Sequence, residues 1–228
     1  MQISGSIALV TGANRGLGRE FATQLLARGA AKVYATTRSS AVDIPGVEVL
    51  TLDVTDPASI ARAAEAAPDV NLLINNAGVS TGANLVSGDL DLLRQEMDTH
   101  FWGTLRMIRA FAPSLSGGAI LNVLSALSWF AYDGAGGYGA AKAAQWNLTN
   151  GVRLELAAQK TLVTGLHLGA ADTDMMAWYD GPKAAPATVV ASALDGIEAN
   201  RLEVLADDWS RTVKASLAAD PSEFYQLR

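Results

Sequence analysis

Short apolar segments alternate along the chain with longer segments in which alanine and leucine recur at helical spacing. Such an alternation is typical of right-handed βαβ crossovers, which build a parallel sheet covered by helices on both faces. The predicted strands are Ser6–Val10, Lys32–Thr37, Val47–Leu52, Asn71–Asn75, Ala119–Leu124, Leu162–Leu168 and Leu202–Leu205. The predicted helices are Gly16–Arg28, Asp56–Ala66, Leu90–Phe111 (in one or two pieces), Ala140–Ala158 and Pro186–Ala199. We therefore expect an α/β fold with a doubly wound parallel sheet, three layers and a single domain over residues 1–228.

Composition narrows the class of protein. Half of the 228 residues are hydrophobic, which is enough for a sizeable core, and the net charge of −6 comes without a run of lysine and arginine. A nucleic-acid or anionic-membrane surface is therefore not expected. The chain has no cysteine and only two histidines, His100 and His167, so a metal site built on cysteine or histidine is excluded. A carboxylate site stays possible, but we expect no metal. No signal peptide or membrane-spanning stretch is evident, and we expect a cytoplasmic protein.

A glycine-rich loop joins the first predicted strand to the first predicted helix. It reads Thr11-Gly12-Ala13-Asn14-Arg15-Gly16-Leu17-Gly18. Glycines at 12, 16 and 18 allow a tight turn and a close approach of the backbone to a ligand. A helix N-terminus presents free N–H groups and a partial positive charge, which suit a pyrophosphate. The loop predicts a dinucleotide site to which Gly12, Asn14, Arg15, Gly16, Leu17 and Gly18 contribute.

The end of the second predicted strand indicates which dinucleotide binds. A carboxylate there would bind the ribose hydroxyls of NAD, but this strand ends in Thr37-Arg38. Arg38 and Arg15 suit a 2′-phosphate instead, so we expect NADP(H), with NAD less favoured. Asp53 and Val54, after the third strand, are candidates for contact with the adenine. Asp53 is alternatively a cap of the following helix, although Asp56 is better placed for that task.

Three residues have the chemistry of a proton-transfer site. Tyr138 and Lys142 are four residues apart, so they share a helical face, and Ser125 follows an apolar strand. The pKa of tyrosine is ordinarily about 10. A neighbouring ammonium and a cationic nicotinamide ring would both lower it. Tyr138 could then exchange a proton with a carbonyl or alcohol oxygen.

Together these motifs resemble the short-chain dehydrogenase/reductase family. The shared residues are Thr11-Gly12-x-x-x-Gly16-x-Gly18, Asn75-Asn76-Ala77-Gly78, Ser125 and Tyr138-x-x-x-Lys142, within residues 5–200. The resemblance implies a Rossmann-type domain, hydride transfer between NAD(P)H and a carbonyl or alcohol, and a homodimer or homotetramer. It implies that Lys142 also binds the nicotinamide ribose. Further cofactor contacts implied are Asn75, Ala77, Gly78, Gly169, Ala171 and Thr173.

One position departs from the family pattern. The family usually has asparagine where this chain has His100, and that residue helps to hold a water between the lysine and solvent through a local helix distortion. Histidine can keep the backbone part of this role, and its side chain can also shuttle protons by titrating. Alternatively it is only a hydrogen-bonded side chain. Our hypothesis is a retained but altered proton relay, which places His100 with the catalytic residues.

The substrate side carries bulky apolar residues. A short lid is expected near residues 173–186, with Met175, Met176 and Trp178, and Trp129 lies on the facing loop. These four residues predict a hydrophobic pocket, although some of them are alternatively core or subunit contacts. No pair of cations is placed for an anionic substrate. We therefore expect a neutral hydrophobic ketone or aldehyde.

Two other functions stay open on the sequence alone. One is a regulatory protein that senses NADPH with little turnover, for which His100 is the only hint. The other is a lyase or epimerase on the same scaffold.

Overall fold

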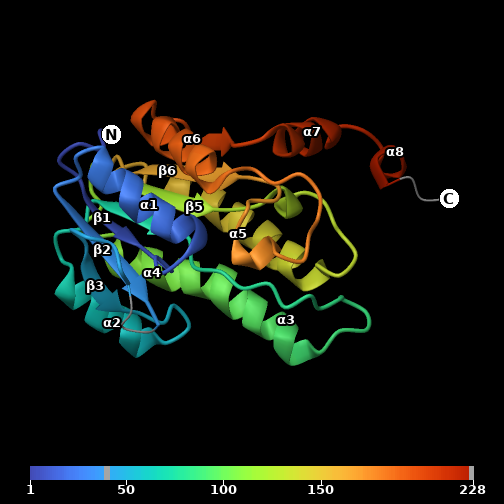
Figure 1. Ribbon diagram of the computed structural model, residues 1–228, viewed down its shortest axis with the longest axis horizontal. Helices are drawn as coiled ribbons and strands as arrows, with labels where there is room; N and C mark the ends of the chain where they lie inside the picture. Colours follow the sequence, from blue (N-terminus) through green and yellow to red (C-terminus); the bar gives the residue numbers. More distant parts are fainter. Residues whose placement is uncertain (39–41, 226–228) are drawn as a thin grey trace.

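The structure is a computed structural model and describes residues 1–38 and 42–225. Within these residues, seven strands form one parallel sheet in the order β3-β2-β1-β4-β5-β6-β7 (Figure 1). They are β1 (Ile7–Val10), β2 (Lys32–Thr37), β3 (Glu48–Thr51), β4 (Leu72–Asn75), β5 (Ala119–Val123), β6 (Leu162–His167) and β7 (Glu203–Leu205). Every predicted strand is present, and each end falls within one residue of its predicted place. The fold class is confirmed as an α/β doubly wound sheet of Rossmann type.

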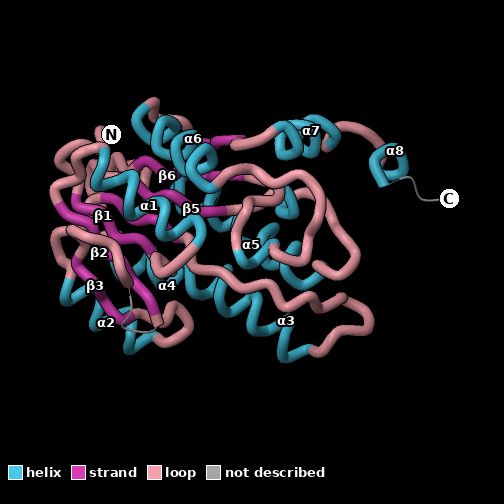
Figure 2. The backbone as a smooth tube through the Cα atoms, in the orientation of Figure 1, coloured by secondary structure: helices cyan, strands magenta, loops and turns pink. Residues whose placement is uncertain are grey.

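Helices cover both faces of the sheet, which makes three layers (Figures 1 and 2). Side chains of a strand alternate between its faces, so Ala8 and Val10 of β1 enter one core and Leu9 enters the other. The first core is closed by α1 (Gly16–Ala27) and α6 (Pro186–Glu198). The second is closed by α2 (Pro57–Ala66), α4 (Thr104–Phe111) and α5 (Gly136–Glu155).

The sheet places the ligand crevice. Strand β1 pairs with β2 on one side and with β4 on the other, so the strand order reverses between β1 and β4. In a doubly wound sheet, ligands bind beyond the carboxyl ends of the strands at this reversal. The loops after β1, β4 and β5 therefore carry the residues of the site.

One predicted helix is divided, which the sequence left open, another begins earlier than predicted, and two more follow β7. The segment predicted as Leu90–Phe111 is α3 (Leu90–Met97) and α4, joined by a π-helix over Asp98–Gly103. Helix α5 begins at Gly136 rather than at Ala140, because packing against α3 favours glycine there. A Cβ at Gly137 would lie 2.3 Å from Leu93 Cδ2, so that position has no room for a side chain. The chain after β7 forms two helices, α7 (Asp208–Ser216) and α8 (Pro221–Tyr225), which extend from the body (Figure 1).

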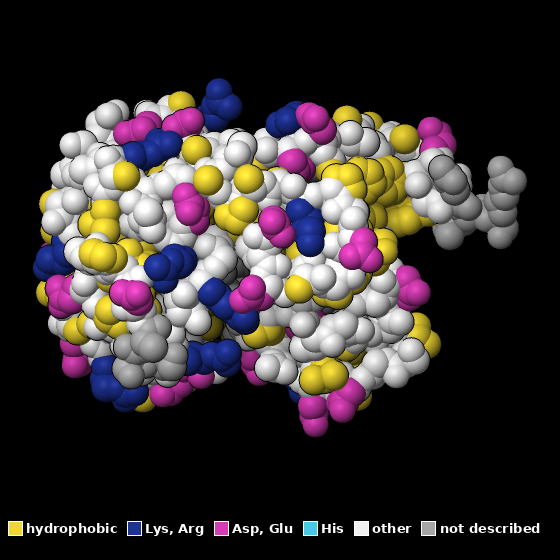
Figure 3. Space-filling model, in the orientation of Figure 1, with side chains coloured by type: hydrophobic (Ala, Val, Ile, Leu, Met, Phe, Trp, Pro, Cys, Tyr) yellow, Lys and Arg dark blue, Asp and Glu magenta, His cyan; other side chains and the backbone are white. Residues whose placement is uncertain are grey.

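The surface mixes both signs of charge with scattered apolar side chains (Figure 3). Hydrophobic side chains gather near the projecting C-terminal segment, where Trp209, Leu217 and Tyr225 are exposed. In the part of the chain that is described, no helix has both the length and the apolar character needed to cross a membrane.

Candidate active site

The glycine-rich loop has the geometry of a phosphate cradle. Gly12 and Gly16 have φ of +67° and +54°, a conformation that favours glycine. A Cβ at Gly18 would lie 2.1 Å from the backbone oxygen of Gly12, so the loop closes on itself only because residue 18 is glycine. Helix α1 begins at Gly16, and no side chain caps its N-terminus. Its first N–H groups and the positive end of its dipole therefore fit a pyrophosphate.

Two arginines border this cradle in different ways. Arg15 Nη1 pairs with Asp174 Oδ2 at 3.0 Å, and both side chains are about two-thirds exposed or more, at 68% and 71%. Such an exposed pair contributes little, so it can exchange for another anion. Arg38 is exposed, and its charge acts on Asp53. Burial favours a higher pKa for Asp53, but hydrogen bonds from Thr55 and the Arg38 charge outweigh it and lower that pKa.

The cap of α2 is Asp56, as the sequence favours, because its Oδ1 accepts a hydrogen bond from the Ala58 N–H at 2.9 Å. Asp53 Oδ1 instead accepts from the N–H and hydroxyl of Thr55. Asp53 thus lies beside Arg38, at the edge of the sheet where the adenine end of a dinucleotide is expected.

The Asn75-Asn76-Ala77-Gly78 motif ties β4 to the start of the phosphate loop. The hydroxyl of Thr11 accepts from the N–H groups of Asn76 and Ala77, both at 2.9 Å. The Asn76 side chain donates to the Thr11 backbone oxygen at 2.9 Å. These bonds hold the two sides of the crevice at a fixed separation.

Ser125, Tyr138 and Lys142 meet where β5 ends and α5 begins. Ser125 hydrogen-bonds the Tyr138 hydroxyl, and Ser125 Oγ also accepts from Leu127 N–H at 3.1 Å. Lys142 Nζ lies 5.6 Å from the centroid of the Tyr138 ring. Lys142 is buried, and its ammonium donates to the Val123 backbone oxygen at 2.7 Å. The three side chains grouped by sequence spacing are therefore neighbours in the structure.

Their pKa values differ from the expectation that Lys142 lowers that of Tyr138. Burial raises the pKa of Tyr138 to about 12. The Ser125 hydrogen bond opposes this shift, and the negative charge of Glu96 adds to it. Burial lowers the pKa of Lys142 to about 7. Burial penalises the charged form of each group, and it is the largest cause of both shifts. Tyr138 is therefore a neutral phenol at neutral pH, which is the form that gives a proton.

His100 lies in the π-helix and faces Tyr138. The two rings meet edge to face with centroids 5.2 Å apart. His100 Nε2 lies 2.7 Å from the Val79 backbone oxygen and 3.3 Å from the Val79 backbone nitrogen, and the shorter contact, to an oxygen that can only accept, favours the proton on Nε2. Gly78 makes room for the ring, since a Cβ there would lie 2.6 Å from His100 Cε1. Burial and the charge of Lys142 hold the pKa of His100 well below 6.5, so it does not titrate near neutral pH.

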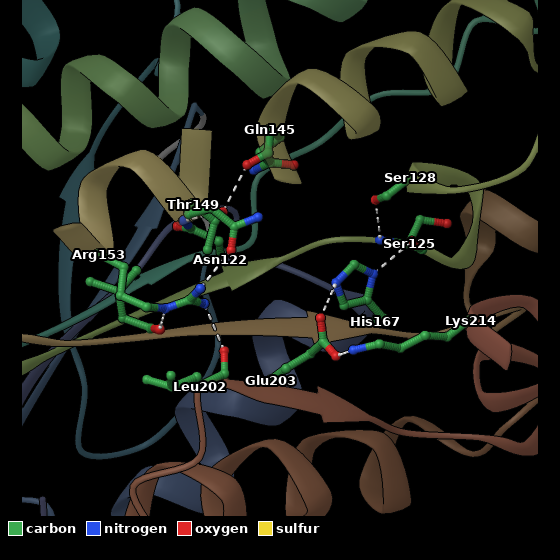
Figure 4. Close-up of polar contacts among 12 residues, drawn as sticks. Asn122, Ser125, Ser128, Gln145, Thr149, Arg153, His167, Leu202, Glu203 and Lys214 are labelled. Carbon is green, nitrogen blue, oxygen red and sulfur yellow. Dashed lines mark hydrogen bonds and ion pairs between the residues drawn. The ribbon is translucent and has the colours of Figure 1, made fainter. Parts of the chain in front are cut away.

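Two buried side chains at the site escaped the sequence analysis. Glu96 Oε1 accepts from the Thr81 N–H at 2.7 Å and from its hydroxyl at 2.9 Å, and Oε2 lies against Gly137. Gln145 Oε1 accepts from Lys142 Nζ at 2.9 Å, while Gln145 Nε2 donates to Thr104 Oγ1 at 2.8 Å. A row of polar side chains continues from Gln145 toward Asn122 (Figure 4). Glu96 has no local spacing that links it to Tyr138 or Lys142, whereas Gln145 lies three residues after Lys142, a helical spacing that could have indicated it.

Comparison with known proteins agrees with this geometry. The family model described as short chain dehydrogenase matches residues 6–181. The chain belongs to the short-chain dehydrogenase/reductase family. It is 32% identical over 181 residues to carbonyl reductase (NADPH) 2 of Sus scrofa, covering 73% of this chain and 72% of that protein. It is also 32% identical over 225 residues to 3-oxoacyl-(acyl-carrier-protein) reductase FabG of Escherichia coli K12, covering 91% and 92%.

A solved structure gives a further match. It is a short chain dehydrogenase from Burkholderia cenocepacia J2315 in complex with NADP, with a TM-score of 0.94 and 39% identity. The match covers 99% of this chain and 98% of that one. As a short-chain dehydrogenase/reductase, the present chain is an NAD(P)-dependent oxidoreductase that acts on carbonyl or alcohol substrates.

Only some of the residues predicted for the substrate pocket lie together in the structure. Gly169, Ala171 and Thr173 follow β6, and a Cβ at Gly16 would touch Thr173 Cγ2, so this loop lies against the phosphate cradle. Met175 and Trp178 are exposed on the segment after Thr173, and Met176 is partly buried. Trp129 does not join them, because its ring stacks on His167 at a centroid distance of 3.7 Å. The loop that carries Trp129 is covered instead by C-terminal residues that were not predicted for the pocket. Phe130 on this loop packs against Trp209, Phe224 and Tyr225.

Proposed function

We propose that the chain is an NADP(H)-dependent carbonyl reductase in which Tyr138 is the proton donor. The observation that supports this most strongly is the neutral phenol of Tyr138, hydrogen-bonded to Ser125 and backed by the buried Lys142. Reduction of a carbonyl needs a proton at the oxygen, and a phenol can give one. The same groups run the reverse reaction when Tyr138 accepts a proton.

Each residue then has a distinct task. When bound, the nicotinamide supplies hydride to the carbonyl carbon. The Ser125 hydroxyl donates to the carbonyl oxygen and orients it, and Tyr138 protonates that oxygen as negative charge develops. Lys142 stabilises the phenolate that remains. His100 borders both groups and contacts the Val79 backbone, and we propose that it alters the proton relay behind Lys142.

We propose that the cofactor residues predicted from the sequence form one continuous site along the carboxyl ends of the strands. We propose that the phosphates lie on Gly12, Asn14, Arg15, Gly16, Leu17 and Gly18. The adenosine lies near Arg38, Asp53, Val54, Asn75, Ala77 and Gly78, and the nicotinamide near Tyr138, Lys142, Gly169, Ala171 and Thr173. The uncapped N-terminus of α1 and its glycine cradle support this placement.

We further propose a neutral, hydrophobic ketone or aldehyde as the substrate. The exposed side chains of Met175 and Trp178, with Met176 between them, support an apolar lid near residues 173–186. We also propose a single domain over 1–228 and assembly as a homodimer or homotetramer. No nucleic-acid partner is proposed.

Consumption of NADPH with a panel of ketones and aldehydes tests the function. We expect steady turnover that is faster with uncharged apolar carbonyls than with carboxylate-bearing ones. Tight NADPH binding with no turnover on any member of the panel would overturn the proposal in favour of a sensor. Product formation without net change in NADPH would favour a lyase or an epimerase.

Arg38 is expected to set the preference for NADPH. Arg38→Ala should weaken NADPH binding about 10- to 100-fold and leave NADH binding nearly unchanged, because only the 2′-phosphate loses its charged partner. Fluorescence titration with both cofactors measures the effect. Arg94→Ala, at an exposed ion pair on α3, is the control. Equal loss for both cofactors would contradict this role.

His100→Asn tests whether the histidine tunes the relay. Asparagine is smaller, so water can approach Lys142. The pKa of Lys142 should then rise toward its ordinary value. We expect the alkaline limb of the kcat profile to move up by about one pH unit. His100→Gln, closer in size, should move it less. An unchanged profile in His100→Asn would show that His100 has only a packing role.

A further inference from the structure

A second group of titratable residues lies beside the backbone of Ser125, and His167 is its one buried member. It consists of His167 at the end of β6, Glu203 on β7 and Lys214 on α7 (Figure 4). Glu203 and Lys214 form an ion pair. His167 is fully buried and has no place in the chemistry described above.

Within the described residues, the side chain of His167 makes one hydrogen bond, and it is to the backbone of Ser125. Nδ1 lies 3.0 Å from the Ser125 backbone oxygen. Nε2 lies 3.7 Å from Glu203 Oε1, which is too long for a hydrogen bond. Burial lowers the pKa of His167 to about 4. The hydrogen bond to Ser125 opposes this shift, and the charges of Lys214 and Lys142 add to it. The neutral ring must therefore carry its proton on Nδ1, because a carbonyl oxygen can only accept.

The face of the same ring supports the loop that follows Ser125. Trp129 stacks on His167 with 15° between the ring planes. Lys214 Nζ lies 5.5 Å from the centroid of Trp129, so the indole contacts two of the three members of the cluster, His167 and Lys214. Ser125 and Trp129 flank the short helix Ala126–Ser128, whose first turn Ser125 Oγ caps. One side chain thus holds both ends of this loop.

We propose that His167 is a positioning residue for Ser125, with the edge of its ring fixing the serine and its face fixing Trp129. This inference rests on the proposed function. The neutral imidazole donates one hydrogen bond to the Ser125 backbone and stacks on Trp129. These two contacts help to fix the position of Ser125 at the end of β5. Glu203 and Lys214 lie on the side of His167 that faces away from Ser125. Through His167, β7 and α7 therefore influence the position of Ser125.

Two substitutions of His167 distinguish the role of its hydrogen bond to Ser125 from the role of its stacking on Trp129. His167→Phe keeps a ring for Trp129 and removes the hydrogen bond, and we expect kcat to fall about tenfold with little change in KM. His167→Asn places an amide N–H near the position of Nδ1 and removes the stacked face. It should keep kcat within about threefold of the wild type and raise KM instead.

Thr164→Val is the matched control. Thr164 is buried on the same strand, and its hydroxyl donates to the Arg201 backbone oxygen at 2.7 Å, away from Ser125. It should lower Tm and leave kcat unchanged. Wild-type kcat in His167→Phe, or an equal loss in Thr164→Val, would overturn the proposal.

Nitrogen-15 NMR of the wild-type imidazole is independent of activity. We expect a neutral His167 with its proton on Nδ1 throughout the pH range in which the protein is folded and the ring neutral. A proton on Nε2 would overturn the positioning role even in a fully active enzyme. Absence of turnover in the wild type, with the proton on Nδ1, would instead count against the proposed function alone.

Discussion

Replacing Tyr138 by phenylalanine is expected to lower kcat for carbonyl reduction about 10³-fold, because the ring stays and the transferable proton is lost. The edge contact with His100, at a centroid distance of 5.2 Å, involves the ring and is retained. The substitution nearly conserves volume, so the fold should persist. NADPH affinity should change little, since the ring still packs where it did. Steady-state kinetics and a cofactor titration on the same preparation measure both effects.

Tyr132→Phe is the control for this substitution. Tyr132 lies on the loop before α5 and is half exposed, so loss of its hydroxyl should leave kcat unchanged. Activity of Tyr138→Phe within tenfold of the wild type would mean that another group protonates the substrate. Ser125 would then be the first alternative, as it shares the hydrogen bond with Tyr138.

The sheet was predictable because its signal is local. A strand buried on both faces is a short apolar run, as in Ile7-Ala8-Leu9-Val10, and every strand end fell within one residue. The start of α5 was not predictable from propensity, since glycines at 136, 137 and 139 disfavour a helix. Packing decides there, because Glu96 and Leu93 leave no room for a side chain at 137.

The candidate site divides in the same way. The spacing of Tyr138 and Lys142 on one helix brings them together by geometry alone, and Ser125 follows from the end of β5. Glu96 and His167 act through contacts between distant segments, which leave no pattern in the sequence. Gln145 lies three residues after Lys142 on the same helix, and that spacing could have indicated it. The direction of the Tyr138 pKa was missed for a related reason, since it depends on how far the hydroxyl is buried.

Removing the ammonium of Lys142 is the other substitution with a large expected effect. Lys142→Met keeps an unbranched side chain of similar length, and we expect kcat to fall about 10²- to 10³-fold because the phenolate of Tyr138 loses its charged neighbour. Gln145 Oε1 and the Val123 backbone oxygen also lose their donor, so Tm should fall. Lys160→Met, at an exposed position after α5, is the control and should change neither quantity.

The pH dependence of kcat distinguishes loss of the charge from loss of packing. Burial lowers the pKa of Lys142 to about 7, so its ammonium predominates below that pH and is lost as the pH rises through it. We therefore expect wild-type kcat for reduction to decline on the alkaline side of about pH 7, and the residual kcat of Lys142→Met to stay flat there. Tyr138, with a pKa of about 12, and His100, with a pKa well below 6.5, do not titrate in this range. A decline at the same pH in Lys142→Met would therefore assign it to a group outside the Ser125, Tyr138 and Lys142 cluster and leave Lys142 with a packing role.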